Sequence, residues 1–529
     1  MSSFLILLLS FAVFAWAYFF YAKRFEAILG ADPKKPTPAF SKFDSVDYIP
    51  AKNVLVLFGH HFSSIAGAGP IIGPVIAVML WGWLPALLWV IIGTVFIGGI
   101  HDFGSLVVSI KQGGSSVADV SQHVISKRVK IIFSLFVWLA LILVIAVFAW
   151  FCADTFVKEP KIVLPSLGLI PVAILCGYLL YVRQRNLASV TALGLLLLVG
   201  LIFVGNILPI KAGLNIWLFI LLFYCYLASI LPVNILLQPR DYLSSYLLFF
   251  GLGMGYICLL FTRPPIEMPF YHNWVSSEGY LWPALFVTVA CGAVSGFHSL
   301  IASGTTSKQI SNEAQARKIG YGAMVVEAML AILAVLSVAV LFNSRMNFAA
   351  ILKSRGPSAL FGDGYGYITK PMLGSYGLFV AITILNAFIL TTLDTATRIT
   401  RYISEELFKI KNKHISTAFV IFLAGMLAFS GKWSRIWPVF GASNQLVAAL
   451  SLFVLASWLI AKHKTIRFVL APAIFMLITT LVSLLAQARR YFISRDIMLL
   501  IIVILLMGLA FFMILEVVPL ISKRRRVNV

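Results

Sequence analysis

Hydrophobic residues in this 529-residue chain form long runs, and the polar residues are confined mostly to short breaks between them. Apolar runs of about 17 to 25 residues are long enough to cross a bilayer as helices. Reading the runs between charged or Pro/Gly-rich breaks predicts an all-α polytopic membrane protein with about fifteen transmembrane helices. Their centres lie near residues 13, 68, 95, 141, 174, 198, 226, 252, 292, 331, 384, 423, 449, 477 and 508.

Composition agrees with this membrane class. The chain is 61% hydrophobic and 11% charged, and its mean hydropathy is +0.98, far above that of soluble domains. Its 41 Lys and Arg residues outnumber 19 Asp and Glu residues. Because these charges lie mostly in short loops beside apolar runs, a positive-inside bias explains them better than nucleic-acid binding.

Loop charge also predicts the topology. With the N-terminus outside and the C-terminus in the cytoplasm, the inner loops hold about two thirds of the Lys and Arg residues. This topology assigns 1–52 to an N-terminal span and a cytoplasmic loop, and 53–262 to a first repeat region with extra spans. It assigns 280–461 to a second repeat region, and 462–529 to C-terminal spans with a basic cytoplasmic tail.

The sequence contains no Walker loop, GxSxG elbow or HExxH motif, so an enzyme is not expected and any transport would depend on an ion gradient. The five cysteines are scattered singly in or beside apolar runs, which is typical of small core residues.

The segment His60–Pro74, HHFSSIAGAGPIIGP, interrupts an apolar run with glycines, prolines and polar residues. Glycine and proline break the helical hydrogen-bond ladder, and broken membrane helices often form transporter sites. We expect unwound backbone over 63–69. The candidate substrate-binding residues here are His60, His61, Ser63, Ser64, Gly67 and Gly69.

A second interrupted segment is similar to the first. The nine residues His61–Gly69 align without gaps with Gly296–Gly304, and an odd number of predicted spans separates the two segments. They are therefore expected to cross the membrane in opposite directions, as in an inverted-repeat transporter, with a second unwound stretch over 299–304. Packing seams rich in Gly and Ser are the alternative interpretation. The second segment adds His298, Ser299 and Ser303 as candidate substrate-binding residues.

Ionisable residues at membrane depth are expensive and indicate function by default. Adjacent histidines point about 100° apart on a regular helix, so His60 and His61 could share a pocket only if the helix unwinds. Near them in the predicted core, IGGIHDFGS supplies His101 and Asp102. Three interpretations are open for these groups: a proton relay or anion contact, a metal site without a recognised spacing, or structural hydrogen bonding between helices.

The segment TTLDTATRITRY places a carboxylate, Asp394, among hydroxyls and four residues before Arg398. This arrangement is either a simple ion pair or an ion-coupling site for H⁺ or Na⁺, in which Arg398 keeps Asp394 ionised. The hydroxyls belong to Thr391, Thr392 and Thr395. Further along, FGASNQL supplies Asn444 and Gln445, which would bind substrate or tie helices together.

These motifs together resemble the carbon starvation protein A family of bacterial inner-membrane carriers. GHHFSSIAGAGPIIGP, WGWLPALLW, GGIHDFGS, SGFHSLIASGTTSKQ, TTLDTATRITRY and FGASNQL follow in order between about residues 50 and 450. The resemblance implies a secondary uptake carrier for small carbon sources, with a leucine-transporter-like core of the amino acid, polyamine and organocation carriers. It also implies pyruvate with proton symport, or short peptides, as substrate.

From these features we expect an alternating-access symporter in the bacterial inner membrane that uses no cofactor and is coupled to H⁺, with Na⁺ as the alternative. The candidate site is poor in acids that could bind a peptide ammonium, which favours a monocarboxylate such as pyruvate over a peptide. A membrane nutrient sensor using the same pocket is a further alternative. The sequence does not specify an oligomeric state or a bound metal.

Overall fold

The computed structural model describes residues 1–529 except 1, 45–47, 52, 232–235, 344–345 and 528–529. The predicted domain boundary at residue 52 lies outside the described residues, as does the end of the basic tail. The described chain is helical almost throughout, with one hairpin of strands β1 (Val275–Ser276) and β2 (Gly279–Tyr280). The prediction of an all-α membrane protein is confirmed.

The centre of every predicted transmembrane span lies in a helix or at a break between two half-helices. In the first half of the chain the α-helices are α1 (Ser3–Trp16), α2 (Ala22–Leu29), α3 (Pro38–Ser41), α4 (Val54–Ile65), α5 (Gly69–Trp81), α6 (Trp83–Gly93), α7 (Gly99–Lys111), α8 (Val117–Val124), α9 (Lys127–Lys158), α10 (Val163–Gly177), α11 (Leu187–Ile207), α12 (Leu214–Ile230) and α13 (Leu237–Thr262). In the second half they are α14 (Phe286–Thr288), α15 (Gly296–Gly304), α16 (Gly322–Ala339), α17 (Phe348–Arg355), α18 (Pro357–Leu373), α19 (Gly377–Leu407), α20 (Lys413–Phe429), α21 (Trp433–Ala461), α22 (Arg467–Ile493) and α23 (Ile497–Val527).

The expected count of fifteen spans is not confirmed. Among the described residues, 11 helices are long and apolar enough to cross a membrane, or up to 12 if the bent pair α4–α5 is one span. The helices α12 and α20 have 17 residues each, fewer than the roughly 20 that cross a bilayer core. The segment near residue 292 is split between α14 and α15.

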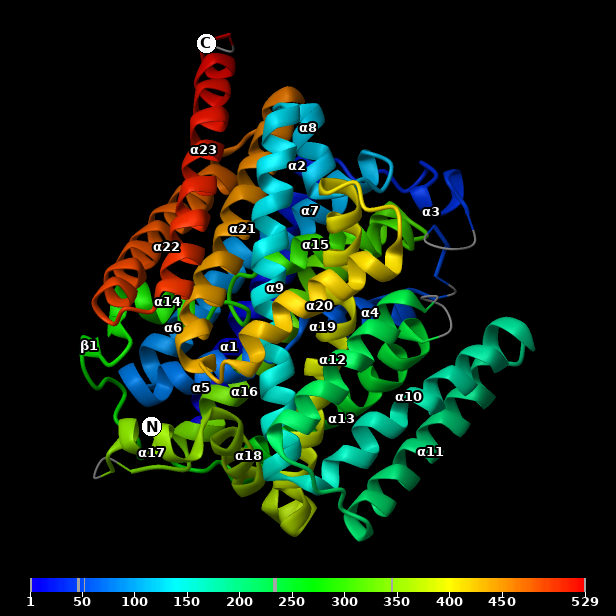
Figure 1. The fold of residues 1–529 in the computed structure, drawn as a ribbon, viewed down its shortest axis with the longest axis vertical. Helices are drawn as coiled ribbons and strands as arrows, with labels where there is room; N and C mark the ends of the chain where they lie inside the picture. The colour runs from blue at the N-terminus through cyan, green and yellow to red at the C-terminus, as the bar shows by residue number, and fades with distance from the viewer. Residues whose placement is uncertain (1, 45–47, 52, 232–235, 344–345, 528–529) are drawn as a thin grey trace.

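Burial separates a core from two flanks. In α21, 94% of the most apolar window is buried, whereas the corresponding fractions are 17% in α11 and 28% in α23. A helix that is hydrophobic all round must lie in a core or face lipid. Figure 1 shows α10 and α11 on one flank and α22 and α23 on the opposite flank, with α9 running between them.

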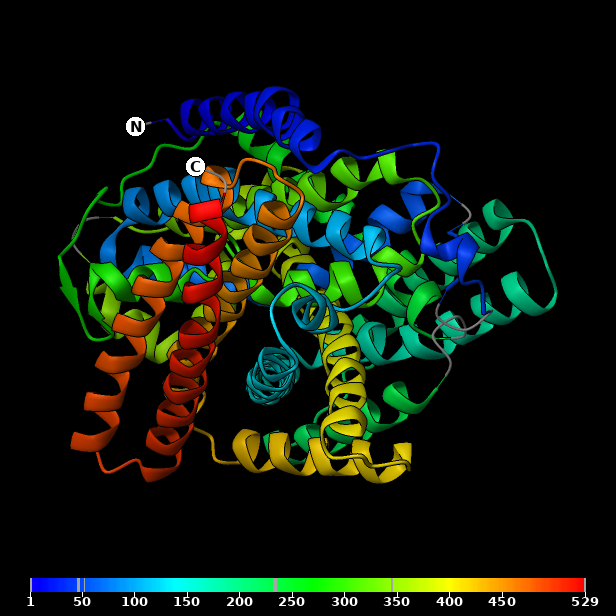
Figure 2. The same cartoon turned by 90° about the horizontal axis from the view of Figure 1, so that it is seen from above.

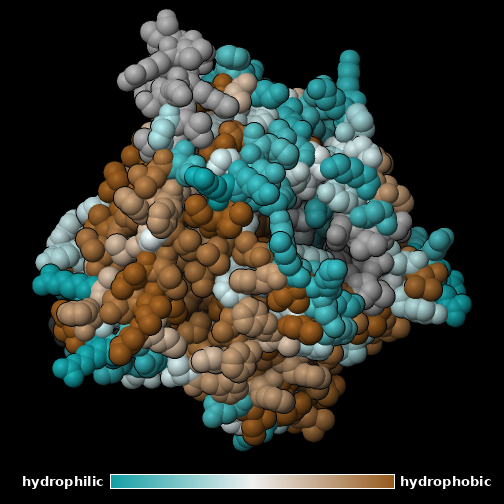
Figure 3. All heavy atoms as spheres, turned by 45° about the horizontal axis from the view of Figure 1, so that its top comes forward, coloured by the Kyte–Doolittle hydropathy of each residue, from teal (hydrophilic) through white to brown (hydrophobic). Residues whose placement is uncertain are grey.

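The outer surface matches a membrane location. Figure 3 shows hydrophobic residues over most of the central face, with hydrophilic residues gathered toward the top and at the edges. Viewed from above, α1 lies along one side of the bundle and α20 along the opposite side (Figure 2). An apolar surface of this extent needs a bilayer around it.

Two broken helices cross inside the bundle. α4 and α5 are bent by 45° at Ala66–Ala68, and the chain between α14 and α15 is non-helical over 289–295. The first half of each broken segment contacts the second half of the other, because α4 touches α15 and α5 touches α14. The two segments therefore run in opposite directions, as the sequence predicted.

The positions of the breaks differ from the expectation. Residues 63–65 belong to α4, and residues 299–304 belong to α15, so the second unwound stretch precedes the motif. The serines do not break α15 because their hydroxyls donate back to helix carbonyls, Ser299 to Gly296 at 2.7 Å and Ser303 to Ser299 at 2.6 Å. The gapless alignment therefore matches the end of one half-helix with the beginning of another, and its register was wrong.

Glycine permits the close approach at the crossing. A Cβ added at Gly69 would lie 2.3 Å from the Cβ of Cys291, and one added at Gly292 would lie 3.3 Å from the Cα of Pro70. These positions bring the two breaks into direct contact. Any larger side chain would separate the two halves of the core.

Candidate functional site

The crossing is surrounded by α9, α19 and α21. A Cβ added at Gly67 would lie 2.5 Å from the ring of Phe148 on α9 and 2.8 Å from the hydroxyl of Thr392 on α19. Asn444 on α21 accepts a hydrogen bond from the Phe297 amide at 2.9 Å and donates to the Ser295 hydroxyl at 3.0 Å. α9 and α19 therefore meet the interruption in α4–α5, and α21 meets the start of α15.

The two amides of the FGASNQL motif tie helices together. Besides the contacts of Asn444 with the start of α15, the Nε2 of Gln445 donates to the Phe286 carbonyl at 2.7 Å. Both contacts satisfy backbone groups that the break leaves without helical partners. Of the two interpretations open for these residues, the geometry supports helix tying. Substrate binding by either one stays a prediction.

A fully buried charged cluster joins α7, α15 and α16, and we call Asp102, His298 and Glu327, with His101, the His298 cluster. The Nδ1 of His298 lies 2.8 Å from Asp102 Oδ2, and its Nε2 lies 3.2 Å from Glu327 Oε2. The other oxygen of Asp102 lies 2.7 Å from His101 Nδ1. All four side chains are 0% exposed, so the cluster is isolated from bulk water.

The adjacent histidines on α4 point to different partners, as the helical geometry predicted. The Nδ1 of His60 lies 3.0 Å from Asp241 Oδ2 on α13. The Nδ1 of His61 lies 2.7 Å from the hydroxyl of Thr306, just after α15. His60 also lines a small cavity of about 100 Å³ with residues of the loop around Pro50. The two rings do not share one pocket.

The expected pairing of Asp394 was wrong. Its carboxylate pairs with Arg240 of α13, and it also accepts a hydrogen bond from the Tyr224 hydroxyl at 2.6 Å. Arg398 turns to the adjacent helix and donates to the carbonyls of Ala228 and Leu231. The last carbonyls of α12 have no helical donor, and the guanidinium of Arg398 supplies one.

The remaining predicted hydroxyls divide into two groups. Three of them donate to backbone carbonyls: Ser63 to that of Asp241 at 3.3 Å, Thr391 to that of Ala387 at 2.9 Å and Thr395 to that of Thr391 at 3.1 Å. The hydroxyls of Ser64 and Thr392 are buried and have no hydrogen-bond partner among the described residues. These two hydroxyls are therefore available to a ligand at the crossing.

The geometry does not favour a metal ion. Across the described ranges, no group of three or more His, Cys, Asp or Glu side chains is arranged to hold one. In the His298 cluster, both ring nitrogens of His298 already face carboxylates. A nitrogen that faces a carboxylate cannot direct its lone pair at a metal without rearrangement.

The sequence analysis did not identify several polar residues of the site, above all Arg240, Asp241 and Glu327. Glu327 had a usable signal, because it is a lone acid within the apolar run MVVEAMLAIL. Arg240 and Asp241 lie between the predicted span centres near residues 226 and 252, whereas α13 begins at Leu237 and carries both into the protein interior. Tyr224 and Thr306 had no comparable signal.

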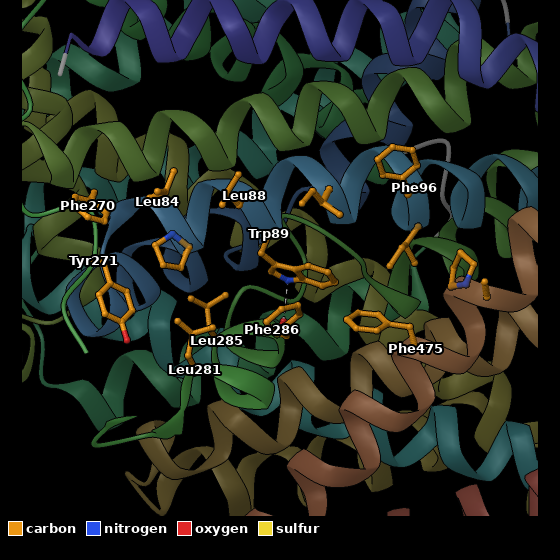
Figure 4. A pocket seen from close by; sticks show the side chains of 15 residues that line it. Leu84, Leu88, Trp89, Phe96, Phe270, Tyr271, Leu281, Leu285, Phe286 and Phe475 are labelled. Atoms are coloured by element: carbon orange, nitrogen blue, oxygen red, sulfur yellow. Dashed lines mark hydrogen bonds between the residues drawn. The ribbon is translucent and has the colours of Figure 1, made fainter. Parts of the chain in front are cut away.

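A large apolar groove lies elsewhere on the molecule. It has a volume of about 750 Å³ and lies between α6, the segment before α14, and α22 (Figure 4). Trp89, Phe286 and Phe475 form its middle, with Leu84 and Tyr271 toward one end. None of the residues lining it is charged, so it offers no cation to pair with an anion.

Comparison with known proteins decides the family. Residues 2–354 and 342–483 match the family model described as carbon starvation protein CstA. The chain belongs to the carbon starvation protein CstA family. It is thus a multi-pass membrane protein, and the resemblance stated from its motifs is confirmed.

Two members of the CstA family that are named for their transport activities are similar to this chain over most of their length. The pyruvate/proton symporter BtsT of Escherichia coli is 29% identical over 579 residues, covering 90% of this chain and 80% of its own. The peptide transporter CstA of Bacillus subtilis is 30% identical over 540 residues, covering 90% of this chain and 89% of its own.

Solved structures show the same fold outside the family. A crystal structure of a mutant of the Eremococcus coleocola manganese transporter has a TM-score of 0.55 at 12% sequence identity and covers 91% of this chain and 99% of that chain. At this identity the likeness concerns the fold alone. It shows that this chain shares the fold of that protein.

Proposed function

We propose that this protein is a proton-coupled symporter that imports pyruvate or a related monocarboxylate by alternating access. The observation that carries this proposal is the His298 cluster, in which titratable groups join the half-helix α15 to α7 and α16. Its relatives are named as a pyruvate/proton symporter and as peptide transporters. A carrier function without enzymatic chemistry agrees with those names.

The net charge of the His298 cluster favours a role as a proton-binding site. With both carboxylates ionised and only His298 protonated, the cluster has one net negative charge in a fully buried place. Burying an uncompensated charge is costly, so one more proton stabilises the cluster by making it neutral. Gaining or losing this proton changes how firmly α15 is held, which links proton binding to movement of the half-helix.

The substrate would occupy the crossing of the two broken helices. The predicted serines and glycines of α4–α5 lie there, and Ser64 and Thr392 present hydroxyls without partners among the described residues. Free amides at the beginning of a half-helix favour an anion.

The acids beside the crossing are already paired, Asp102 with histidines and Asp394 with Arg240. A peptide ammonium would have to compete with these cations, which favours a monocarboxylate.

Topology and organisation belong to the same proposal. The N-terminus lies outside, the C-terminus lies in the cytoplasm of a bacterial inner-membrane protein, and the regions 53–262 and 280–461 form the two inverted repeats. The helices α10 and α11 are then an insertion in the first repeat, since they lie on one flank, apart from the crossing (Figure 1).

Uptake by purified protein in liposomes tests the proposal. Radiolabelled pyruvate, other monocarboxylates and short peptides are compared while H⁺ and Na⁺ gradients are varied separately. We expect pyruvate accumulation under an inward proton gradient without added Na⁺. The proposal fails if the protein takes up di- or tripeptides but no pyruvate, or if it requires Na⁺ and ignores the proton gradient.

A further inference from the structure

Arg240 is a fully buried arginine whose guanidinium is only partly used. It lies in the first turn of α13 and is 1% exposed. Its Nη1 faces Asp394 and donates to the Tyr224 hydroxyl at 2.7 Å. Its Nη2 has one long contact, 3.4 Å to the Thr391 hydroxyl, and its Nε has no hydrogen-bond partner among the described residues.

The unused part of the guanidinium is one of its carboxylate-binding edges. A guanidinium presents five N–H donors, and two parallel donors on one edge match the two oxygens of a carboxylate. Asp394 pairs with Nη1, so no anion faces the edge formed by Nε and Nη2 among the described residues. A buried donor without an acceptor costs stability, and a ligand that supplies the acceptor recovers this cost.

This open edge lies beside the helix crossing. Nη2 contacts Thr391, and the next residue, Thr392, lies 2.8 Å from the position that a Cβ would take at Gly67. The hydroxyl of Thr392 is buried without a partner among the described residues, and so is that of Ser64 in the last turn of α4. Donors from α13 and α19 therefore lie beside the interruption, and the Ser64 hydroxyl belongs to the last turn of α4, which leads into it.

We propose that Arg240 is the residue that binds the substrate carboxylate, through its Nε–Nη2 edge, with the hydroxyls of Thr392 and Ser64 as additional donors. The inference rests on the proposed function and specifies its binding site. Asp394 is then a positioning residue, which holds the opposite edge of the guanidinium and keeps the open edge turned toward the crossing.

The charges around this pair explain why a monocarboxylate would need a proton. Arg240 and Asp394 together are neutral, so an entering carboxylate adds one negative charge to a buried site, and one accompanying proton cancels it. The other ionisable or polar-hydrogen groups that surround the pair from the packed helices are Tyr224 and Cys225 of α12, Cys152 of α9, Asp241 of α13, His60 of α4 and Arg398 of α19.

The test compares a carboxylate with its amide. Wild-type protein in liposomes is first assayed with pyruvate and with dialanine, and the compound that it takes up becomes the probe, since both have a carboxylate. The unlabelled probe and its carboxamide are then compared as competitors of labelled-probe binding. This comparison is made in Arg240→Lys, in Asp394→Asn and in the double variant Arg240→Gln with Asp394→Asn. The double variant removes both charges together, so that no unpaired buried charge prevents folding.

We expect Arg240→Lys to weaken probe binding about 10- to 100-fold, since Lys cannot provide the two-pronged contact. Asp394→Asn should bind the carboxylate at least as tightly as the wild type, because the amide oxygen can still accept a hydrogen bond from Nη1 and position the guanidinium, while the competing negative charge is gone. The folded double variant should no longer prefer the carboxylate over the amide. As a matched control, Arg401→Lys changes a different buried arginine, which lies on α19 and has Ser229 and Glu405 as partners. The Arg401→Lys protein should bind the probe normally.

A double variant that folds and still discriminates carboxylate from amide as the wild type does would overturn the assignment of Arg240. Uptake of dialanine but not pyruvate would refute the proposed monocarboxylate substrate while leaving the Arg240 experiment intact with dialanine as the probe. A wild-type protein that takes up neither compound would overturn both proposals.

Discussion

His298 and Glu327 lie 3.2 Å apart, from Nε2 to Oε2, on α15 and α16, and neither side chain is exposed. On its other side the same imidazole faces Asp102 of α7. A half-helix beside a break is thus held by groups whose charge depends on bound protons. This contact connects the chemistry of the site to the half-helix that the proposed transport cycle would move.

Replacing Glu327 separates substrate movement from proton movement. Glu327→Gln keeps the shape of the side chain but fixes its charge at zero, so we expect exchange of pyruvate across the membrane to continue while accumulation driven by a proton gradient is lost. His298→Ala, in contrast, should destabilise the fold by about 3–5 kcal/mol, because it leaves Glu327 unpaired and Asp102 with His101 as its one partner. Counterflow, gradient-driven uptake and thermal unfolding measure these effects. Unchanged accumulation in Glu327→Gln would remove the His298 cluster from the mechanism.

The glycine contact between the breaks gives a second prediction. Gly69→Val would force side-chain atoms into Cys291, which lies 2.3 Å from the added Cβ position, and overpacking of this kind costs about 1–3 kcal/mol. We expect pyruvate uptake to be abolished and thermal stability to fall. Gly253→Ala is the matched control, because no atom lies within 4 Å of its added Cβ. Equal effects of the two substitutions would contradict a special role for the crossing.

Asn444 provides a third test. Its side chain accepts a hydrogen bond from the Phe297 amide at the start of α15, so Asn444→Ala should cost about 0.5–2 kcal/mol, as the loss of a helix cap does. Because this helix start borders the crossing, uptake should fall as well. Asn347→Ala removes a comparable cap from α17, which has no buried residues, and should leave uptake unchanged. The comparison fails if Asn347→Ala reduces uptake as strongly as Asn444→Ala does.

The sequence predicted the helical class, the two broken segments and their opposite directions, because length, hydropathy and glycine content act locally. It did not predict where the second break lies, since that depends on Gly292 packing against Pro70 and on Asn444 reaching Phe297. Nor did it predict that Asp394 pairs with Arg240. That partner lies 154 residues away, and local spacing favoured Arg398.

The candidate site was predicted unevenly for the same reason. His298 and Asp102 were singled out because ionisable residues at membrane depth are rare. Their contact with each other and with Glu327 depends on how three helices pack, which no pattern in one sequence specifies. The amides of Asn444 and Gln445 left both alternatives open until their partners were known.

Acidity should affect the loop between α22 and α23. Burial by itself raises the pKa of Asp496, but hydrogen bonds and charges from Lys432 and Arg435 outweigh it and lower the pKa below its ordinary value. A carboxyl group with a lowered pKa in the folded state contributes stability above the pKa of the unfolded chain, and this stability is lost as the pH falls through the folded value. Thermal unfolding should therefore become easier in acid, and Asp496→Asn should show a smaller decrease. Identical pH profiles for the two proteins would refute this contribution.

Proton movement triggered by pyruvate tests the central claim most directly. Liposomes containing the purified protein and a pH-sensitive dye, with no imposed gradient, receive pyruvate outside in buffer without Na⁺. The account predicts that the lumen acidifies as pyruvate enters, with about one proton for each pyruvate, and that Glu327→Gln shows no such acidification. Pyruvate entry without acidification, or acidification that persists unchanged in Glu327→Gln, would contradict it.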